Sequence, residues 1–347
     1  MKNNLYVDIH VLQNVPPSCI NRDDTGSPKT AKYGGAMRAR VSSQAWKHEM
    51  RKMFREMLDD EEVGIRTKKI TQMIADAVKE TDSAIGDEKA DKLALSALGN
   101  AGIKTDKEGL SPVLMFFSAA QARALAETTV RESKDKKEYQ NALKAAPSVD
   151  MALFGRMVAA DPSLNFDAAA QVAHAISTHA VHNEYDYFTA VDDLIQDEES
   201  GAGHLGTVEF NSATLYRYAT VNVAELQQNL GDRTADAVTC FAEAFMKAMP
   251  MGKQNTFANR TLPDFVYIAL RTDQPVNLVG AFEKPVSSAN GYLEESEKRF
   301  REYAEATYRK YACAPEKIWE FGEMDILQIL ERLKAAVMEK ISESRGE

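Results

Sequence analysis

The positive charge of this chain is concentrated in residues 14–55, and this segment most constrains what the chain can fold into. The protein has 347 residues and a formal net charge of −10, yet residues 14–55 hold nine Lys and Arg against three Asp and Glu. A local cationic field on an otherwise acidic molecule attracts polyanions at one place and repels them elsewhere. The segment therefore predicts a surface that binds a polyanion.

The cationic segment divides into a loop and a helix. Residues 14–41 contain Pro16-Pro17, Pro28 and Gly34-Gly35, which interrupt regular structure. A helix is expected to begin at Ser42 or Ser43, whose hydroxyl can accept a hydrogen bond from a free backbone N–H. Helical spacing gives it an apolar side with Trp46, Met50, Met53, Phe54 and Met57 and a cationic side with Lys47, Arg51 and Arg55. A cationic side that is only solvated is the alternative.

Composition indicates a soluble globular protein of one large or two ordinary domains. Hydrophobic residues make up 44% of the chain, enough for a sizeable core. The three cysteines lie far apart, which indicates neither a disulfide framework nor a CxxC metal site. The N-terminus is too short and too charged for a secretion signal, and no apolar run reaches the ~20 residues of a membrane span. We expect a cytoplasmic location.

The first half of the chain combines one strand with many helices. Residues 5–12 alternate apolar and polar side chains, which predicts a half-buried strand. From about residue 67 to residue 146 the spacing is helical, and one helix is expected to open at Ser111-Pro112. Residues 168–181 also have the composition of a strong helix. The helical region indicates an insertion or subdomain.

Two extended arms around a glycine-rich tip predict an elongated hairpin. Residues 182–194 and 207–223 are rich in aromatic and β-branched side chains, as strands are. Residues 196–206 between them contain three glycines and predict a flexible tip. We expect the hairpin to project from the body.

The last third of the chain predicts helices around one strand. The expected elements are a helix over 225–248 with a break at Gly231-Asp232, a strand over 264–272, and helices over 294–312 and 326–341. Strands interleaved with helices, two of them far apart in the sequence, indicate an α+β sheet domain interrupted by a helical insertion.

A metal-dependent nuclease is the catalytic alternative, and its ligands would come from the region from His174 to Asp193. Histidines and aspartates gather there, but His174 and His179 are five residues apart rather than four and no HExxH accompanies them. No phosphate-binding loop of the GxxxxGK type and no GxSxG occurs. The candidates are His174, His179, His182, His204, Asp186, Asp192 and Asp193, for which a structural or surface role is the competing interpretation. No cofactor or metal is predicted.

Several strings resemble the CasC family, the backbone subunit of the type I-E CRISPR surveillance complex, Cascade. The first are HVLQNVPPSCINRDDTGSPKTAKYGG and RVSSQAWKHEMRK in the cationic segment. Others follow in the order of the family: VDMALFGRM, VAHAISTHAV, DYFTAVDDL, HLGTVEFNSATLYRYATVNVAELQQNLG and AFEKPV. They cover about two-thirds of the chain. Residues 60–146 and the C-terminal end carry no matching string.

The resemblance implies an α+β fold shaped like a right hand. Its palm is a modified RNA-recognition-motif (ferredoxin-like) sheet, with a large helical insertion as fingers and a projecting β-hairpin as thumb. On this chain the first part of the palm is residues 1–60, the fingers are 61–180, and the second part of the palm is 181–347. The thumb lies at about residues 195–215.

The resemblance also implies a set of RNA contacts. Phosphate contacts carry no sequence information, so Lys and Arg suffice to hold any guide sequence. His48 stands where the family has a base such as Arg. The positions carried over are Arg22, Lys29, Arg38, Arg40, Ser42, Gln44, Lys47, His48 and Arg51 for the guide RNA, and Leu205, Thr207 and Phe210 for displacement of bases by the thumb. Met157 is a weaker candidate, and ordinary packing is the alternative for each thumb residue.

The function that the resemblance implies is binding rather than catalysis. Family members assemble head to tail along the spacer of a CRISPR RNA and leave its bases free to pair with target DNA in antiviral defence. The implied partners are the CRISPR RNA, target DNA through the guide, copies of this chain, and the large, small, capping and guide-processing endonuclease subunits.

Overall fold

The computed structural model of this chain describes residues 4–145, 147–157, 164–190 and 204–346. It is an α+β protein, as the sequence predicts. Within these residues, one nine-stranded sheet has the order β11-β10-β1-β9-β7-β3-β2, and β6 and β8 pair with β9 beside this path. By its internal contacts the chain forms two units, residues 1–50, 172–220 and 241–333 in the first, and 51–171, 221–240 and 334–347 in the second. The fingers are predicted as one continuous range, residues 61–180. The second unit differs from this range because it also includes residues 221–240 and 334–347.

β1 (Tyr6–Ser18) and β10 (Phe265–Arg271) form a long antiparallel pair inside the sheet. Its register runs from Tyr6 opposite Arg271 to Leu12 opposite Phe265. The predicted half-buried strand is in fact buried on both faces from Val7 to Leu12, because helices cover both sides. β11 (Lys317–Glu320) extends the sheet beyond β10, and β9 (His204–Asn222) lies on the other side of β1.

Two segments form strands where the sequence predicts none. The expected loop over 14–41 contains the end of β1 and the hairpin of β2 (Thr30–Tyr33) and β3 (Ala36–Val41). The predicted helix over 168–181 is wrong, because this segment forms β6 (Ala170–Val172) and β7 (Ala175–Ser177), and β7 pairs with both β3 and β9. The tertiary pairing overrides the helical propensity of its alanines.

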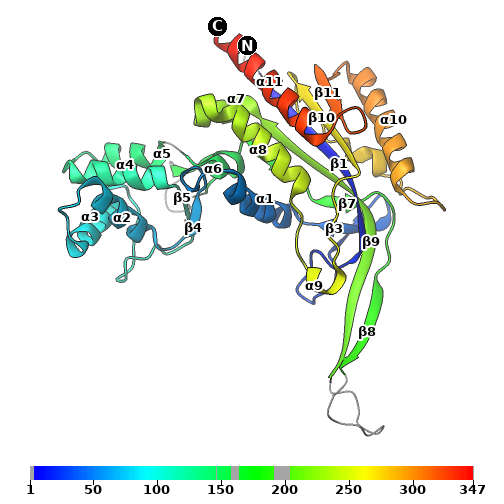
Figure 1. Ribbon diagram of the computed structural model, residues 1–347, viewed down its shortest axis with the longest axis horizontal. Coiled ribbons are helices and arrows are strands. Elements are labelled where there is room, and N and C mark those ends of the chain that lie inside the picture. Colours follow the sequence, from blue (N-terminus) through cyan, green and yellow to red (C-terminus); the bar gives the residue numbers. More distant parts are fainter. Residues whose placement is uncertain (1–3, 146, 158–163, 191–203, 347) are drawn as a thin grey trace. The chain divides into compact units, whose positions relative to one another are not determined.

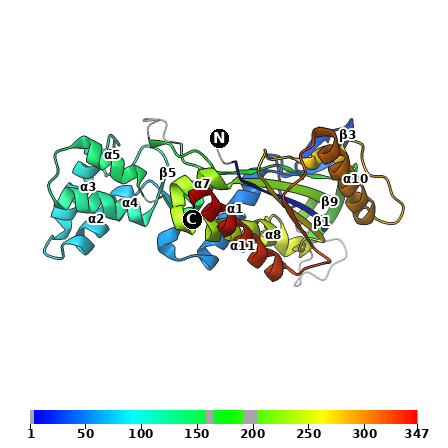
Figure 2. The ribbon, with the colours of Figure 1, turned by 90° about the horizontal axis from the view of Figure 1, so that it is seen from above.

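Helices cover both faces of the sheet, with α10 (Leu293–Tyr311) on one face (Figures 1 and 2). Its Phe300 packs on a cluster from β1, β9 and β10 that includes Leu12, Tyr216 and Tyr267. On the opposite face, Trp46 of α1 (Ser43–Met57) and Phe245 near the end of α8 (Thr234–Lys247) meet Arg217 of β9. The predicted helix beginning at Ser42 or Ser43 is confirmed.

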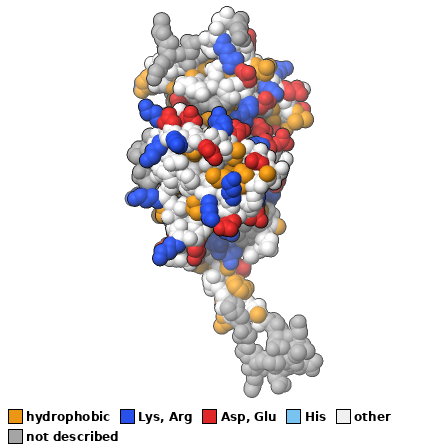
Figure 3. All heavy atoms as spheres, turned by 90° about the vertical axis from the view of Figure 1, so that its left-hand side faces the viewer, with side chains coloured by type: hydrophobic (Ala, Val, Ile, Leu, Met, Phe, Trp, Pro, Cys, Tyr) orange, Lys and Arg blue, Asp and Glu red, His pale blue; other side chains and the backbone are white. Residues whose placement is uncertain are grey.

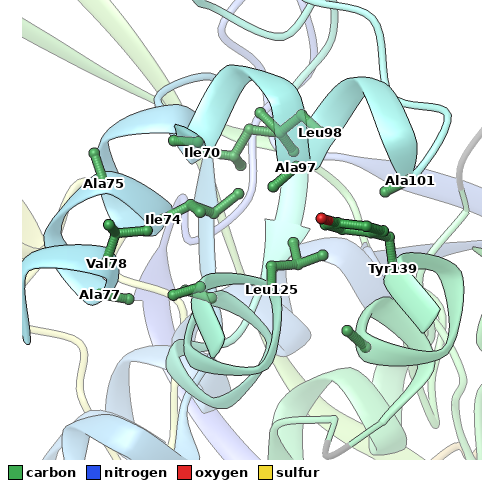
Figure 4. Packing of buried hydrophobic residues seen from close by; sticks show 14 of the residues in the cluster. Ile70, Ile74, Ala75, Ala77, Val78, Ala97, Leu98, Ala101, Leu125 and Tyr139 are labelled. Atoms are coloured by element: carbon green, nitrogen blue, oxygen red, sulfur yellow. The ribbon is translucent and has the colours of Figure 1, made fainter. Parts of the chain in front are cut away.

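The second unit has a core of its own, formed mainly by four helices (Figure 4). Ile74, Leu98 and Leu125 come from three of these helices and are fully buried, with Tyr139 from the fourth beside them. The helices are α2 (Ile70–Thr81), α3 (Asp87–Asn100), α4 (Ala119–Val130) and α5 (Lys136–Lys144). A pair of short strands, β4 (Ile65–Thr67) and β5 (Met115–Phe117), belongs to the same unit.

The helix expected to open at Ser111-Pro112 begins later. β5 takes up part of that segment, and α4 begins at Ala119 after a capping box of Ser118 and Gln121. The end of the apolar run, Met115–Phe117, forms a strand because Met115 and Phe117 enter the core while Phe116 meets Arg51 and Arg66. A run of this length does not distinguish a helix from a buried strand.

The remaining elements follow the sequence prediction closely. The break at Gly231 separates α7 (Val223–Leu230) from α8, and it is occupied by a short 3-10 turn, Gly231–Arg233. The other described helices are α6 (Val149–Phe154), α9 (Gln254–Phe257) and α11 (Ile326–Arg345), with 3-10 turns at Asp60–Glu62 and Leu278–Phe282.

The predicted hairpin is present and extends from the sheet (Figure 1). β8 (Glu184–Ala190) pairs with the first part of β9, from Glu184 opposite Phe210 to Ala190 opposite His204. Most of the predicted tip lies outside the described residues. None of the described helices is long and apolar enough to cross a membrane.

Candidate nucleic-acid interface

Three of the predicted RNA-binding cations lie near one exposed histidine in the first unit. Arg40 Nη1 lies 3.2 Å from His174 Nδ1. The pKa of His174 is lowered by partial burial and then by the charges of Arg40, Lys29 and Lys47. The cations come from β3, from the segment before β2, and from α1, so the sheet brings together residues that are distant in the sequence. We call Lys29, Arg40, Lys47 and His174 the cationic patch.

Backbone and side-chain hydrogen bonds fix the patch in place. The amide of Arg40 donates to the carbonyl of Lys29 at 2.9 Å, and its Nε donates to the carbonyl of Thr30 at 3.1 Å. Arg40 also stands opposite Ile176 in the pairing of β3 with β7. Since β7 leads on from His174, the pairing sets the separation of the Arg40 guanidinium and the His174 imidazole.

The start of α1 adds a second kind of anion-binding group to the patch. Ser42 is buried, and its Oγ accepts a hydrogen bond from the amide of Ala45 at 3.3 Å, so this hydroxyl caps the helix. Gln44 and His48 are exposed on the first turns, and Lys47 is half-buried between them in the sequence. A helix N-terminus carries partial positive charge, which favours anions near these side chains.

Arg38 lies away from the patch although its position in the sequence suggests otherwise. Its side chain is fully buried, and the guanidinium donates to the carbonyls of Ser177 at 2.9 Å and Phe282 at 2.9 Å. A further hydrogen bond reaches the carbonyl of Glu283 at 3.2 Å. Arg38 therefore joins β3 to the segment after β10, and we leave it out of the proposed interface.

Arg51 and Arg22 also differ from the patch in their surroundings. Arg51 is on the cationic side of α1, but it belongs to the second unit, where its Nε donates to Asp150 Oδ2 at 3.0 Å. Arg22 is exposed in the turn before β2, and its backbone forms an isolated antiparallel β-bridge with Pro28. The Arg22 side chain is exposed, so a phosphate can reach it. Arg51 already forms an ion pair with the buried carboxylate of Asp150.

The register of the hairpin separates the predicted thumb residues onto two faces. Leu205 lies opposite Thr189, and Thr207 lies opposite Tyr187. Since directly opposed residues share a face, Leu205 and Thr207 share theirs with Tyr187 and Tyr185. Phe210 is on the other face, where its ring centre lies 5.7 Å from that of Phe257 in α9.

The first of these faces carries the exposed side chains of Tyr185, Tyr187 and Leu205 beside Glu209, and hydrophobic side chains are visible on the hairpin in Figure 3. Tyr187 is 64% exposed and Leu205 is 58% exposed. The whole segment 184–211 contains eight Asp and Glu and no Lys or Arg. The hairpin therefore lacks cations for phosphates and offers aromatic and aliphatic surface, on which nucleic-acid bases stack.

The residues of the nuclease alternative do not form a metal site in the described part of the chain. Among described residues, no group of three or more His, Cys, Asp and Glu could hold a metal ion. His179 is buried, its Nε2 accepts the amide of Thr214 at 3.1 Å, and its ring stacks on Tyr292 at 3.6 Å. Burial lowers the pKa of His179, which suits a neutral structural imidazole. Asp192 and Asp193 lie outside the described residues.

Comparison of the whole chain with known protein families shows the family to which it belongs. The family described as CT1975-like protein matches residues 7–343. The chain belongs to this CT1975-like family. The resemblance to CasC is thereby confirmed.

Two solved structures contain chains similar to this CT1975-like protein. One belongs to a "CRISPR RNA-guided surveillance complex, pre-nicking"; it is 33% identical, with a TM-score of 0.80, over 96% of this chain and 100% of that one. The other belongs to a "CRISPR RNA-guided surveillance complex" and is 30% identical, with a TM-score of 0.62, over 95% and 99%. No curated protein sequence matches the chain.

Sequence reasoning missed two features of the interface in this CT1975-like chain. The sequence predicts His174 as a possible metal ligand rather than as a neighbour of the cations. Residues 168–181 are predicted to be a helix, and a helix there would not pair with the segment that contains Arg40. The sequence predicts Tyr187 only as part of an extended arm of the hairpin and not as a residue of the interface. The pairing of residues 186–190 with 204–208 was the missing signal, since it places Tyr187 opposite Thr207.

Proposed function

We propose that this chain is a non-catalytic backbone subunit of a type I-E CRISPR surveillance complex that holds the guide RNA by its phosphates. The observation that carries the proposal is the cationic patch, in which Arg40 contacts His174 and Lys29 and Lys47 lie near enough to lower its pKa. The similarity to chains of two CRISPR RNA-guided complexes supplies the class of polyanion. The three cations grip the backbone, and the exposed Arg22, Gln44 and His48 extend the contact along the strand.

The sheet of the first unit acts as the palm and the β8–β9 hairpin as the thumb. Contacts to phosphates leave the base edges free, so the guide stays available for pairing with target DNA. The apolar face of the hairpin, with Leu205, Thr207 and Tyr187, displaces bases on the neighbouring copy, because its exposed side chains replace the lost stacking. Phe210 holds the base of the hairpin against Phe257. The second unit contributes the fingers.

The assembly that follows is a head-to-tail array of copies. Such a heterologous interface does not close on itself, so the array needs the RNA and end-binding subunits to set its length. We propose that these are the large, small, capping and guide-processing endonuclease subunits. Target DNA joins through the guide, and the complex serves antiviral defence.

Co-purification of RNA tests this function. Lys29→Glu and Lys47→Glu are expressed with a CRISPR RNA, and the retained RNA is measured per mole of protein. Lys32→Glu is the matched control, because Lys32 is an exposed cation of β2 in the same segment. We expect each patch variant to retain at least about fivefold less RNA than the control, with unchanged circular dichroism. Equal retention by all three variants would contradict the proposal.

A further inference from the structure

A second cationic arrangement lies within the second unit, around the ring of Phe116. The guanidinium carbon of Arg51 lies 4.5 Å from the ring centre and that of Arg66 lies 5.1 Å from it. Phe116 is only 5% exposed, whereas Arg66 is exposed on β4. A cation over an aromatic face is attracted by the ring quadrupole. The ring therefore holds two guanidinium groups at one place, one of them open to solvent.

Gly64 makes this arrangement rigid. Its amide donates to Asp150 Oδ1 at 2.8 Å, and its carbonyl accepts from Arg51 Nη2 at 3.2 Å. A Cβ at this position would lie 2.5 Å from the Phe116 ring and 2.6 Å from Ser148 Oγ. The absence of a side chain at Gly64 thus lets the ring approach the backbone that also holds Arg51.

The arrangement has one carboxylate for two guanidinium groups. Asp150 is fully buried and accepts Arg51 Nε at 3.0 Å. No carboxylate lies within ion-pair distance of Arg66 among the described residues. Burial and the charge of Arg51 lower the pKa of Arg66, and Asp150 offsets this only in part. A second anion beside Arg66 would relieve the repulsion between the two cations.

An exposed apolar side chain precedes β5, the strand that carries Phe116. Leu114, two residues before Phe116, is 66% exposed, whereas Ile65 is opposite Phe117 and so lies on the other face of β4 from Arg66. A guanidinium plane next to aliphatic surface suits an unstacked base, since both present flat or apolar contact area. A free inorganic anion would use the charge but not this apolar surface.

We propose that Arg66 contacts a phosphodiester of single-stranded nucleic acid, held in place by Phe116 and by the Arg51–Asp150 pair. This site belongs to the second unit and is additional to the cationic patch of the first. It rests on the proposed function only for the identity of the polyanion. The same chemistry fits a guide RNA or a DNA strand, and the two sources are separated by the test.

The test measures binding of the full chain to labelled single strands of RNA and of DNA with the same sequence, as a function of salt. Arg66→Gln removes the charge, and Arg66→Lys keeps the charge but loses the planar group. Arg131→Gln is the matched control, an exposed arginine of the same unit. We expect Arg66→Gln to weaken binding about fivefold and to lower the log–log salt slope by about 0.7, with Arg66→Lys intermediate and Arg131→Gln near wild type. Thermal unfolding confirms that the variants are folded.

The outcomes separate this proposal from the proposed function. A loss on RNA alone assigns the strand to RNA, a loss on DNA alone assigns it to DNA, and a loss on both assigns the contact to the shared phosphodiester. Equal affinity of Arg66→Gln and Arg131→Gln for both strands would overturn the proposal. The same substitution is repeated in a Lys29→Gln, Lys47→Gln background. Full RNA binding by that background, with loss only from Arg66→Gln, would reject the cationic patch and keep the Arg66 site.

Discussion

The guanidinium carbon of Arg217 lies 3.8 Å from the centre of the Trp46 ring, and this contact joins the long strand of the hairpin to the first turns of the cationic helix. Arg217 is on β9, and Trp46 precedes Lys47 on α1. The fully buried guanidinium also donates to Gln13 Oε1 at 2.7 Å and to the carbonyl of Phe245. Burial lowers the pKa of Arg217 to about 9. A buried cation thus fixes β9, α1 and β1 relative to one another.

Loss of Arg217 should destabilise the chain strongly. Arg217→Ala removes the stack on Trp46 and leaves the side-chain oxygen of Gln13 and the carbonyl of Phe245 without their donor. We expect a loss of about 3 kcal/mol in the free energy of unfolding, measured by urea denaturation, because buried acceptors without partners are costly. Arg309→Ala, an exposed arginine of α10, should change it by less than about 0.5 kcal/mol. Equal midpoints for the two variants would show that the buried guanidinium does not stabilise the sheet.

The two faces of the hairpin should respond differently to substitution. Leu205→Ala and Tyr187→Ser remove exposed side chains, so they should leave thermal stability unchanged. In RNA-bound assemblies they should reduce the 2-aminopurine fluorescence that reports displaced bases. Phe210→Ala loses packing on Phe257 and should lower the melting temperature by several degrees. Unaltered fluorescence in Leu205→Ala and Tyr187→Ser would show that this face of the hairpin does not displace bases.

Affinity for RNA should rise as the pH falls, through His174. Partial burial and the neighbouring cations lower the pKa of His174 in the free protein. A bound phosphate raises it again, so binding takes up a proton wherever the pH lies between the two pKa values, and affinity grows toward acid. The gain is up to about tenfold for each unit by which the phosphate raises the pKa.

His174→Gln is the variant that isolates this proton. Its RNA affinity should vary less between pH 7.5 and 5.5 than that of the wild type, as followed by fluorescence anisotropy at constant ionic strength. His182→Gln is the matched control, an exposed histidine before the hairpin. Parallel pH profiles of wild type and His174→Gln would place the phosphate away from His174.

The sequence predicts the long, strongly periodic elements well. The start of α1, the break between α7 and α8, β10, α10 and α11 all fall within a few residues of their predicted bounds, because each has a clear apolar period or a capping residue. The segment 168–181 is predicted to be a helix because its alanines favour one in isolation, but it forms β6 and β7. Only the pairing of Ile176 with Arg40 and with Tyr216 shows that it belongs in the sheet.

The cationic patch could be predicted only in part, because its surroundings also depend on segments that are distant in the sequence. Charge patterning gives all nine cations of residues 14–55, and the resemblance to CasC implies contacts by Lys29, Arg40 and Lys47, but neither separates these three from Arg38. Adjacent β-strand positions alternate between faces, so Arg40 and Arg38 share a face of β3, and only the neighbouring segments decide which of them is covered. The carbonyls of Ser177 and Phe282 enclose Arg38, and Phe282 is distant in the sequence.

Two buried groups beneath α10 should give opposite contributions to acid stability. Burial, with the charge of Arg271, lowers the pKa of His10 to about 3, so its stabilising contribution is present above about 6.5 and is lost as the pH falls toward 3. Burial raises the pKa of Asp8 to about 6 despite its hydrogen bonds to Val276 and Tyr218, so the folded state takes up a proton and gains stability as the pH falls from 6 toward 3.8.

Urea denaturation between pH 7 and pH 4 separates the two contributions. His10→Gln should lose less stability than the wild type over this range, whereas Asp8→Asn should lose more, because each substitution leaves the other group unopposed. Comparison of slopes rather than absolute values removes the cost of the substitution itself. Identical slopes for all three proteins would mean that neither group changes its protonation on unfolding.

The most direct test of the account is the salt dependence of CRISPR RNA binding by the full, nuclease-treated chain, compared with Lys29→Gln/Arg40→Gln/Lys47→Gln. If the patch holds phosphates, the log–log slope of affinity against salt should fall by about 2, since each lost contact to a single strand removes about 0.7. Lys32→Gln should keep the wild-type slope. Equal slopes for the triple variant and the wild type would show that the RNA lies elsewhere, and would contradict the assignment of the cationic patch.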